Sequence, residues 1–126
     1  MRVLMVEPGK EPFVTEIGNN LESLQKAVDG HIEVLYLEEN VLIVCNEEGK
    51  CMGLEGNRRI DNGDIIAGAF LICGSNDEGE MISLTDEQIK KYTERFKEPE
   101  YYTAEEVEDA IFIEVYAGDD EDEMEV

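Results

Sequence analysis

Residues 21–37, LESLQKAVDGHIEVLYL, constrain the fold more strongly than any other stretch of this chain. Leu21, Leu24 and Val28 recur at helical spacing, and the charged residues between them fall on other faces, which is the pattern of an amphipathic helix. Gly30 supplies the residue type that most readily ends a helix in the left-handed conformation. The residues that follow alternate as in a strand. We therefore expect a helix that ends at Gly30 and leads directly into a strand.

Strands are expected on both sides of this helix. Residues 2–7 and 12–17 flank a Pro-Gly turn, which predicts a β-hairpin. Residues 41–45, VLIVC, are apolar at every position, which predicts a central strand that is covered on both faces. We also expect strands at residues 50–54 and 65–73.

Loop and cap signals separate these elements. The side chain of Asn19 or Asn20 can accept from a free amide at the start of the first helix. Residues 56–64, GNRRIDNGD, are polar and rich in Gly and Asn, which predicts a loop. Gly68 lies inside a predicted strand, where it indicates a bulge or a close backbone approach.

Two helix starts are clear in the C-terminal half. Thr85 begins a T-x-x-Q capping box, with Leu84 and Ile89 as a hydrophobic staple, and Pro99 ends the helix that follows. Thr103 begins a second box, T-x-x-E. These signals predict one or two helices after the strand-rich part of the chain.

The expected fold class is α+β, with a mostly antiparallel sheet of five or six strands, one helix packed on it, and one or two C-terminal helices. We expect residues 1–74 to form the core domain. Residues 75–118 would form a C-terminal helical extension with a strand at residues 111–116, and residues 119–126 a disordered acidic tail.

The charge of the chain limits its partners. Asp and Glu number 32 against 10 Lys and Arg, so the formal net charge is −22. Such a field repels nucleic acid and anionic membranes and attracts cationic partners, although acidity can also serve solubility alone. Residues 1–74 hold 13 acidic and 6 basic residues, whereas residues 75–126 hold 19 and 4. The negative charge is therefore concentrated in the C-terminal part.

The cysteines indicate a reducing compartment. Cys45, Cys51 and Cys73 are odd in number, so they cannot all pair within the chain. Buried reduced thiols in a cytoplasmic protein are the expected state, because a single C-x5-C spacing without a second pair is weak evidence for zinc. The N-terminal apolar run is too short for a signal peptide, and no run approaches membrane-spanning length.

Few residues suggest chemistry. His31 is the only histidine, and no nucleophile motif accompanies it, so we predict a structural or surface role. Asn57, Arg58 and Arg59 could form a small anion or carboxylate site, because guanidinium groups bind such ligands bidentately. The alternative is that these arginines pair with local Glu and Asp. We predict no catalytic residue, no metal site and no cofactor.

Five segments of the first 74 residues resemble a known family: VLMVEPGKEPFVTEI, LESLQKAVDGHIEVLYL, NEEGK, GLEGNRRI and DIIAGAFLICG. Together they are similar to a small uncharacterised domain family of firmicute bacteria, their conjugative elements and phages. Family members often continue with a segment like residues 79–96. The resemblance implies a mobile-element or phage context and no established activity, and it carries over no catalytic residue.

Charge and context together give the functional expectation. The first hypothesis is a non-enzymatic accessory protein that binds a basic protein surface, such as a nucleic-acid-binding protein or a host defence factor, in the manner of a nucleic-acid mimic. The alternative is a small-ligand module in which Asn57, Arg58 and Arg59 engage an anion or nucleotide. An enzyme ranks third, because the sequence marks no nucleophile or tuned acid–base pair.

Overall fold

The computed structural model describes residues 1–61 and 63–110. Its elements in chain order are β1 Arg2–Val6, β2 Phe13–Glu16, α1 Leu21–Val28, β3 Ile32–Glu38, β4 Val41–Asn46, β5 Gly56–Arg59, β6 Ile65–Ala67, β7 Phe70–Ser75, β8 Met81–Ile82 and α2 Asp86–Arg95. A further helical segment covers residues 104–110. The strand predicted at residues 111–116 and the tail predicted at 119–126 lie outside the described residues.

Six of the strands form one sheet, in the order β2-β1-β7-β4-β3 with β8 paired to β7. Every neighbouring pair is antiparallel, which confirms the α+β prediction. The predicted hairpin is confirmed as β1–β2. Strand β4 lies between β7 and β3 and is buried along its whole length, as its apolar sequence predicted.

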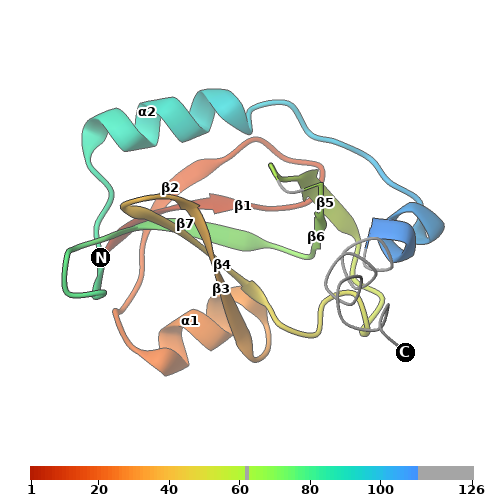
Figure 1. Cartoon of the computed structure of the whole chain (residues 1–126), viewed down its shortest axis with the longest axis horizontal. Helices are drawn as coiled ribbons and strands as arrows, with labels where there is room; N and C mark the ends of the chain where they lie inside the picture. The colour runs from red at the N-terminus through yellow and green to blue at the C-terminus, as the bar shows by residue number, and fades with distance from the viewer. Residues whose placement is uncertain (62, 111–126) are drawn as a thin grey trace, which may run out of the picture.

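The two labelled helices cover opposite faces of this sheet (Figure 1). Successive side chains of a strand point to opposite faces of the sheet, so adjacent residues of β1 pack into different cores. Leu4 belongs to the buried cluster that contains Tyr92 of α2 and Phe96, the C-cap residue of that helix. Val3 belongs to the cluster that contains Leu24 of α1. Each such side chain contributes roughly 1.5–3 kcal/mol when fully buried. The predicted C-terminal extension thus supplies part of the core, while the division at residue 74 stays a prediction.

The helix starts follow the predicted capping rules. Asn20 is the cap of α1, and its Oδ1 accepts from the amide of Ser23 at 2.8 Å. Thr85 and Gln88 exchange the two bonds of a capping box at the start of α2. Thr103 exchanges the same pair of bonds with the residue three positions later, before helical residues 104–110.

The end of α1 corrects one prediction. The left-handed residue is Asp29, with φ 62° and ψ 44°, and not Gly30. Short polar residues adopt this conformation more easily than most. Gly30 has a different reason to be glycine, because a Cβ there would lie 2.6 Å from Nδ2 of Asn46. The glycine therefore permits the close approach of β4 to the end of the helix.

Three further corrections concern residues 50–73. The strand predicted at residues 50–54 is part of a turn, and the loop predicted at residues 56–64 begins with strand β5. The single strand predicted at residues 65–73 is divided into β6 and β7, which belong to different sheets. The division occurs at Gly68, whose φ of 88° favours glycine. The bulge or close approach predicted there marks the point where the chain changes sheet.

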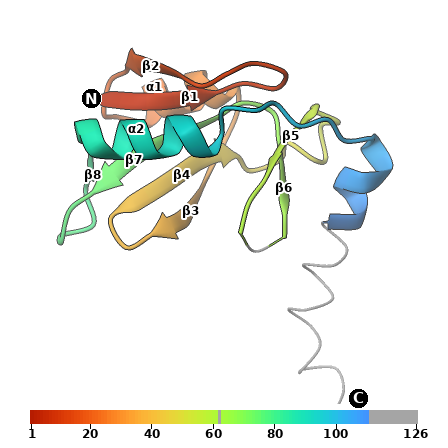
Figure 2. The ribbon, with the colours of Figure 1, turned by 90° about the horizontal axis from the view of Figure 1, so that it is seen from above.

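Strands β5 and β6 form a separate two-stranded sheet. Seen from above, this hairpin projects beside the main sheet, and helical residues 104–110 flank it (Figure 2). Ile65 and Ala67 of β6 form a third buried cluster with Val107 and Ala110. In the described part of the chain, no helix has the length and apolar character needed to cross a bilayer.

Candidate functional site

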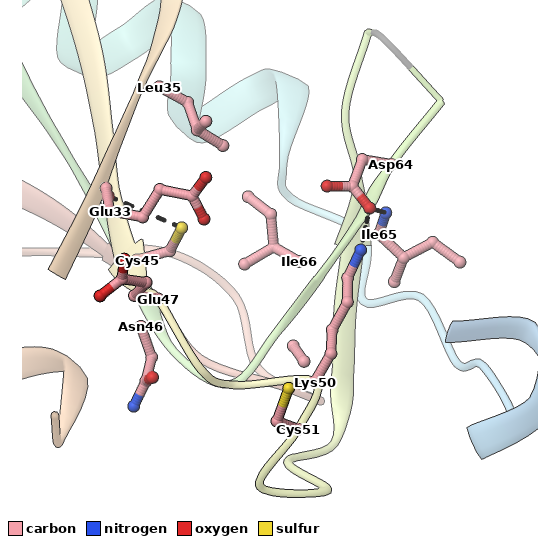
Figure 3. Close-up of a pocket in the computed structure, with 11 residues that line it drawn as sticks. Glu33, Leu35, Cys45, Asn46, Glu47, Lys50, Cys51, Asp64, Ile65 and Ile66 are labelled. Carbon is pink, nitrogen blue, oxygen red and sulfur yellow. Dashed lines mark hydrogen bonds and ion pairs between the residues drawn. The ribbon is translucent and has the colours of Figure 1, made fainter. Parts of the chain in front are cut away.

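The candidate site is a cavity of about 230 Å³ between the main sheet and the β5–β6 hairpin (Figure 3). Strands β3 and β4 form one wall, β6 with the residue before it forms the opposite wall, and the turn after β4 forms the rim. Its lining residues are Glu33, Leu35, Cys45, Asn46, Glu47, Lys50, Cys51, Asp64, Ile65, Ile66 and Ala67.

An internal ion pair occupies one side of the cavity. Lys50 Nζ donates to Asp64 Oδ1, and the two side chains are only 15% and 14% exposed. The same Asp64 oxygen accepts from the amide of Ile65 at 2.8 Å. A pair that is largely removed from water is screened less than a surface pair. The ammonium group of Lys50 is therefore already committed to a partner within the fold.

Glu33 faces this pair from the opposite wall, with its carboxylate directed toward Ile66 (Figure 3). Among residues 1–61 and 63–110, no hydrogen bond or ion pair engages that carboxylate. Burial raises the pKa of Glu33, and repulsion from Asp64 and Glu47 raises it further, against a lowering by Lys50. Within the part of the chain that the structure describes, the cavity thus holds a carboxylate with no hydrogen bond or ion pair to a cationic side chain.

The two cavity cysteines differ in chemistry. Cys45 is buried, and its thiol donates to the carbonyl oxygen of Glu33 at 3.7 Å. Burial, with the charges of Glu33 and Asp64, raises the pKa of Cys45 to about 12, which keeps the thiol protonated and unreactive. Cys51 is exposed at the rim. In the described part of the chain, no group of three or more His, Cys, Asp or Glu side chains is placed to hold a metal ion.

Asn46 fixes the turn that forms the rim. Its Nδ2 donates to the carbonyls of Val28 and Asp29, both at 3.1 Å, and its Oδ1 accepts from the amide of Glu48 at 2.7 Å. One buried amide therefore joins the end of α1 to the turn after β4. The NEEGK segment is explained in part by this geometry, because an Asn side chain can bond both helix and turn.

Gly49 brings the same turn against β6. A Cβ at this position would lie 2.5 Å from the carbonyl oxygen of Ala67, which is a backbone atom and cannot move aside cheaply. Only glycine permits this approach. The contact places Lys50 within reach of Asp64 across the cavity.

The predicted anion-site residues lie elsewhere, on β5. Asn57 and Arg58 are both 0% exposed. Asn57 Nδ2 donates to the carbonyls of Val6 and Gly68 at 2.9 Å. Arg58 Nη1 donates to Asn57 Oδ1 at 2.7 Å, while its Nε and Nη2 reach the carbonyl of Phe96. Burial lowers the pKa of Arg58. The guanidinium of Arg58 therefore donates mainly to backbone carbonyls of the protein. In the described part of the chain it does not pair with nearby Glu or Asp, the partners that the alternative interpretation gave it.

Arg59 is the exposed member of the predicted trio. Its Nη1 donates to the carbonyl of Gly63 at 2.7 Å, and its guanidinium lies 5.5 Å from the ring centroid of Tyr102. The structure thus places the three residues on one strand but leaves only Arg59 accessible to a ligand. His31, at the helix-to-strand junction, is also exposed.

The cavity residues were missed from the sequence because they come from separate segments. Glu33 lies on a strand, Lys50 on a turn and Asp64 just before another strand, without a motif spacing. The one signal that pointed here was the pair Cys45 and Cys51, which both line the cavity. The spacing of these two cysteines is weak evidence for zinc and by itself predicts no cavity.

The model of the family described as "domain of unknown function (DUF3846)" matches residues 1–97. The chain belongs to the DUF3846 family. The match confirms the resemblance to a family without established function, and it extends past the first 74 residues. It includes every labelled strand and both labelled helices, so the DUF3846 region contains the whole cavity. Neither a curated protein nor a solved structure matches the chain.

Proposed function

We propose that the protein is a non-enzymatic binding module that engages a basic surface of a partner protein. The supporting observation is that its basic side chains are largely occupied within the fold, while the sequence holds 32 acidic against only 10 basic residues. Arg58 is buried, and its guanidinium donates to a backbone carbonyl. Within residues 1–61 and 63–110, the basic residues paired with carboxylates are Arg2, Lys10, Lys50, Lys91 and Arg95.

The context of the module forms part of the proposal. The resemblance to a family of firmicute mobile elements and phages supports an accessory role there. The partner would be a nucleic-acid-binding protein or a host defence factor, and the acidic surface would occupy its site for nucleic acid. All three cysteines carry free thiols, which supports a reducing cytoplasm as the compartment.

A pull-down with the full chain as bait tests this function. We expect capture of proteins with basic isoelectric points at about 50 mM salt and their release at about 500 mM, because salt screens exposed charges. Duplex DNA added at low salt should also release a partner whose nucleic-acid site is occupied. An unrelated acidic protein of similar net charge serves as the control bait. Capture of only acidic or neutral proteins, or capture that high salt leaves unchanged, contradicts the proposal.

A small-anion module is the second candidate, and Arg59 is the residue that supports it. The guanidinium of Arg59 is exposed, whereas Asn57 and Arg58 are enclosed. A ligand that binds the folded state raises its melting temperature. A thermal-shift screen with nucleotides and inorganic phosphate at millimolar concentration tests this candidate, and Arg59→Ala should abolish any shift. An unchanged melting temperature counts against it.

A further inference from the structure

We propose that the cavity between β3–β4 and β6 receives the side chain of one lysine or arginine of the basic partner. This inference rests on the function proposed above and names the site through which it would act. Four features of the cavity support it: its volume, its apolar walls, its unpaired carboxylate and its position at an exposed rim.

The volume favours a single side chain over a small-molecule ligand. Sites for drug-sized ligands measure roughly 300–1,000 Å³. The cavity is smaller, at about 230 Å³. A nucleotide is too large for this space, whereas one extended alkyl chain with a charged head can enter it.

The walls match both parts of such a side chain. Leu35 and Ile66 offer apolar surface for the methylene stem, in the way that lysine and arginine stems pack on apolar surface elsewhere. The Glu33 carboxylate, directed toward Ile66, offers an acceptor for the cationic head (Figure 3). A charge-assisted hydrogen bond of this kind is about twice as strong as a neutral one.

The charges of the lining residues also favour a cationic ligand. Among the described lining residues, the carboxylates of Glu33, Glu47 and Asp64 are accompanied by one lysine, Lys50, which is bonded to Asp64. The raised pKa of Glu33 reflects the same imbalance, because burial and like charges disfavour its ionised form. An entering ammonium or guanidinium group would supply the missing charge without displacing the Lys50–Asp64 pair.

The rim favours a protein source for this cation. The exposed residues Glu47 and Cys51 line the cavity at its rim. A side chain that projects from a protein surface can reach such an opening while the rest of that surface meets the acidic exterior. The net charge of −22 steers a polycation more strongly than a single amine.

A binding comparison with hexalysine peptide tests the inference. Hexalysine is titrated into the full chain, into Glu33→Gln and into Glu78→Gln. Glu78 is exposed on the β7–β8 turn and does not line the cavity, so both variants lose the same formal charge but only one changes the cavity. We expect Glu33→Gln to weaken binding about tenfold and Glu78→Gln to weaken it less than about twofold. Amide chemical shifts should change mainly for cavity residues.

The possible outcomes distinguish failure of this inference from failure of the proposed function on which it rests. If Glu33→Gln and Glu78→Gln weaken hexalysine binding equally, the cavity is not the binding site. The acidic surface as a whole then binds the peptide. Absence of hexalysine binding to the wild-type chain at low salt overturns the proposed function and this inference together. In a further titration, n-butylammonium is added at the same total amine concentration as the peptide. If it saturates the cavity, the ligand is a free amine, and the proposal that a partner's side chain enters the cavity is overturned. Thermal melting of each variant confirms that it is folded.

Discussion

The guanidinium group of Arg58 donates to the carbonyl oxygen of Phe96 through both Nε and Nη2, at 3.1 and 2.8 Å. Phe96 is the residue that ends α2, where the carbonyls of the last turn lack partners within the helix. The partial negative charge of that helix end favours a cation. Nη2 also reaches the carbonyl of Lys10, so one buried side chain joins β5, α2 and the loop after β1.

Loss of Arg58 should destabilise the fold strongly. Arg58→Ala leaves buried carbonyls without a donor, each of which costs about 1–3 kcal/mol, so we expect a loss of about 3 kcal/mol or more in unfolding free energy. The matched control is Arg59→Ala, which removes an exposed guanidinium and should cost less than about 1 kcal/mol. Urea denaturation measures both. Similar losses for the two variants would contradict the structural role assigned to Arg58.

Asn46 should be equally hard to replace. In Asn46→Asp, a carboxylate faces the carbonyls of Val28 and Asp29 in place of a donor, so we expect a loss of about 2 kcal/mol at neutral pH. The control is Asn40→Asp, which adds the same charge at an exposed turn position and should change stability by less than about 0.5 kcal/mol. Chemical denaturation distinguishes them, and equal effects would show that charge alone is responsible.

Removal of the Glu33 charge should stabilise the protein in a pH-dependent way. The pKa of Glu33 is raised above its usual value of 4.5, so the folded state holds this proton more tightly than the unfolded state. Its ionisation therefore lowers stability as the pH rises above 4.5. Glu33→Gln should melt at a higher temperature than wild type at about pH 7, and the difference should disappear near pH 4. A constant difference across this range, or one that Glu78→Gln reproduces, would refute the assignment.

The cysteines should react at very different rates. Burial raises the pKa of Cys45 to about 12 and that of Cys73 to about 11, whereas Cys51 is exposed. Because the thiolate is the reactive form, iodoacetamide at about pH 8 should modify Cys51 alone in the native protein. Cys51→Ser should abolish the fast reaction, and unfolding should expose the remaining thiols. Rapid modification of Cys45 in the folded chain, detected by mass spectrometry, would show that the cavity wall opens.

The strand-rich frame could be predicted because its signals are local. The helical spacing of Leu21, Leu24 and Val28, the apolar run of β4 and the capping boxes at Thr85 and Thr103 depend on neighbours within a few positions. Each of these predictions is confirmed. The prediction that Gly30 is the left-handed residue at the end of α1 is wrong, and that residue is Asp29. Both adjacent positions tolerate the left-handed conformation, so the sequence does not distinguish them.

The β5–β6 hairpin could not be predicted, because its burial depends on distant partners. Arg58 is buried only because Phe96 and Lys10 provide carbonyls, and they lie 38 and 48 residues away in the sequence. A polar segment without those partners is correctly taken as a loop. The cavity could not be predicted for the same reason, since Glu33 and Asp64 line one cavity only when the β5–β6 hairpin lies beside the main sheet.

The salt dependence of hexalysine binding to the full chain tests the central claim, that the acidic protein engages a basic surface. The affinity is measured by calorimetry at about 50 and 200 mM sodium chloride, a range over which the screening length falls to less than about 10 Å. The account predicts measurable binding at the lower salt and a loss on the order of tenfold at the higher salt. No binding at low salt, or an affinity that salt does not change, would contradict it.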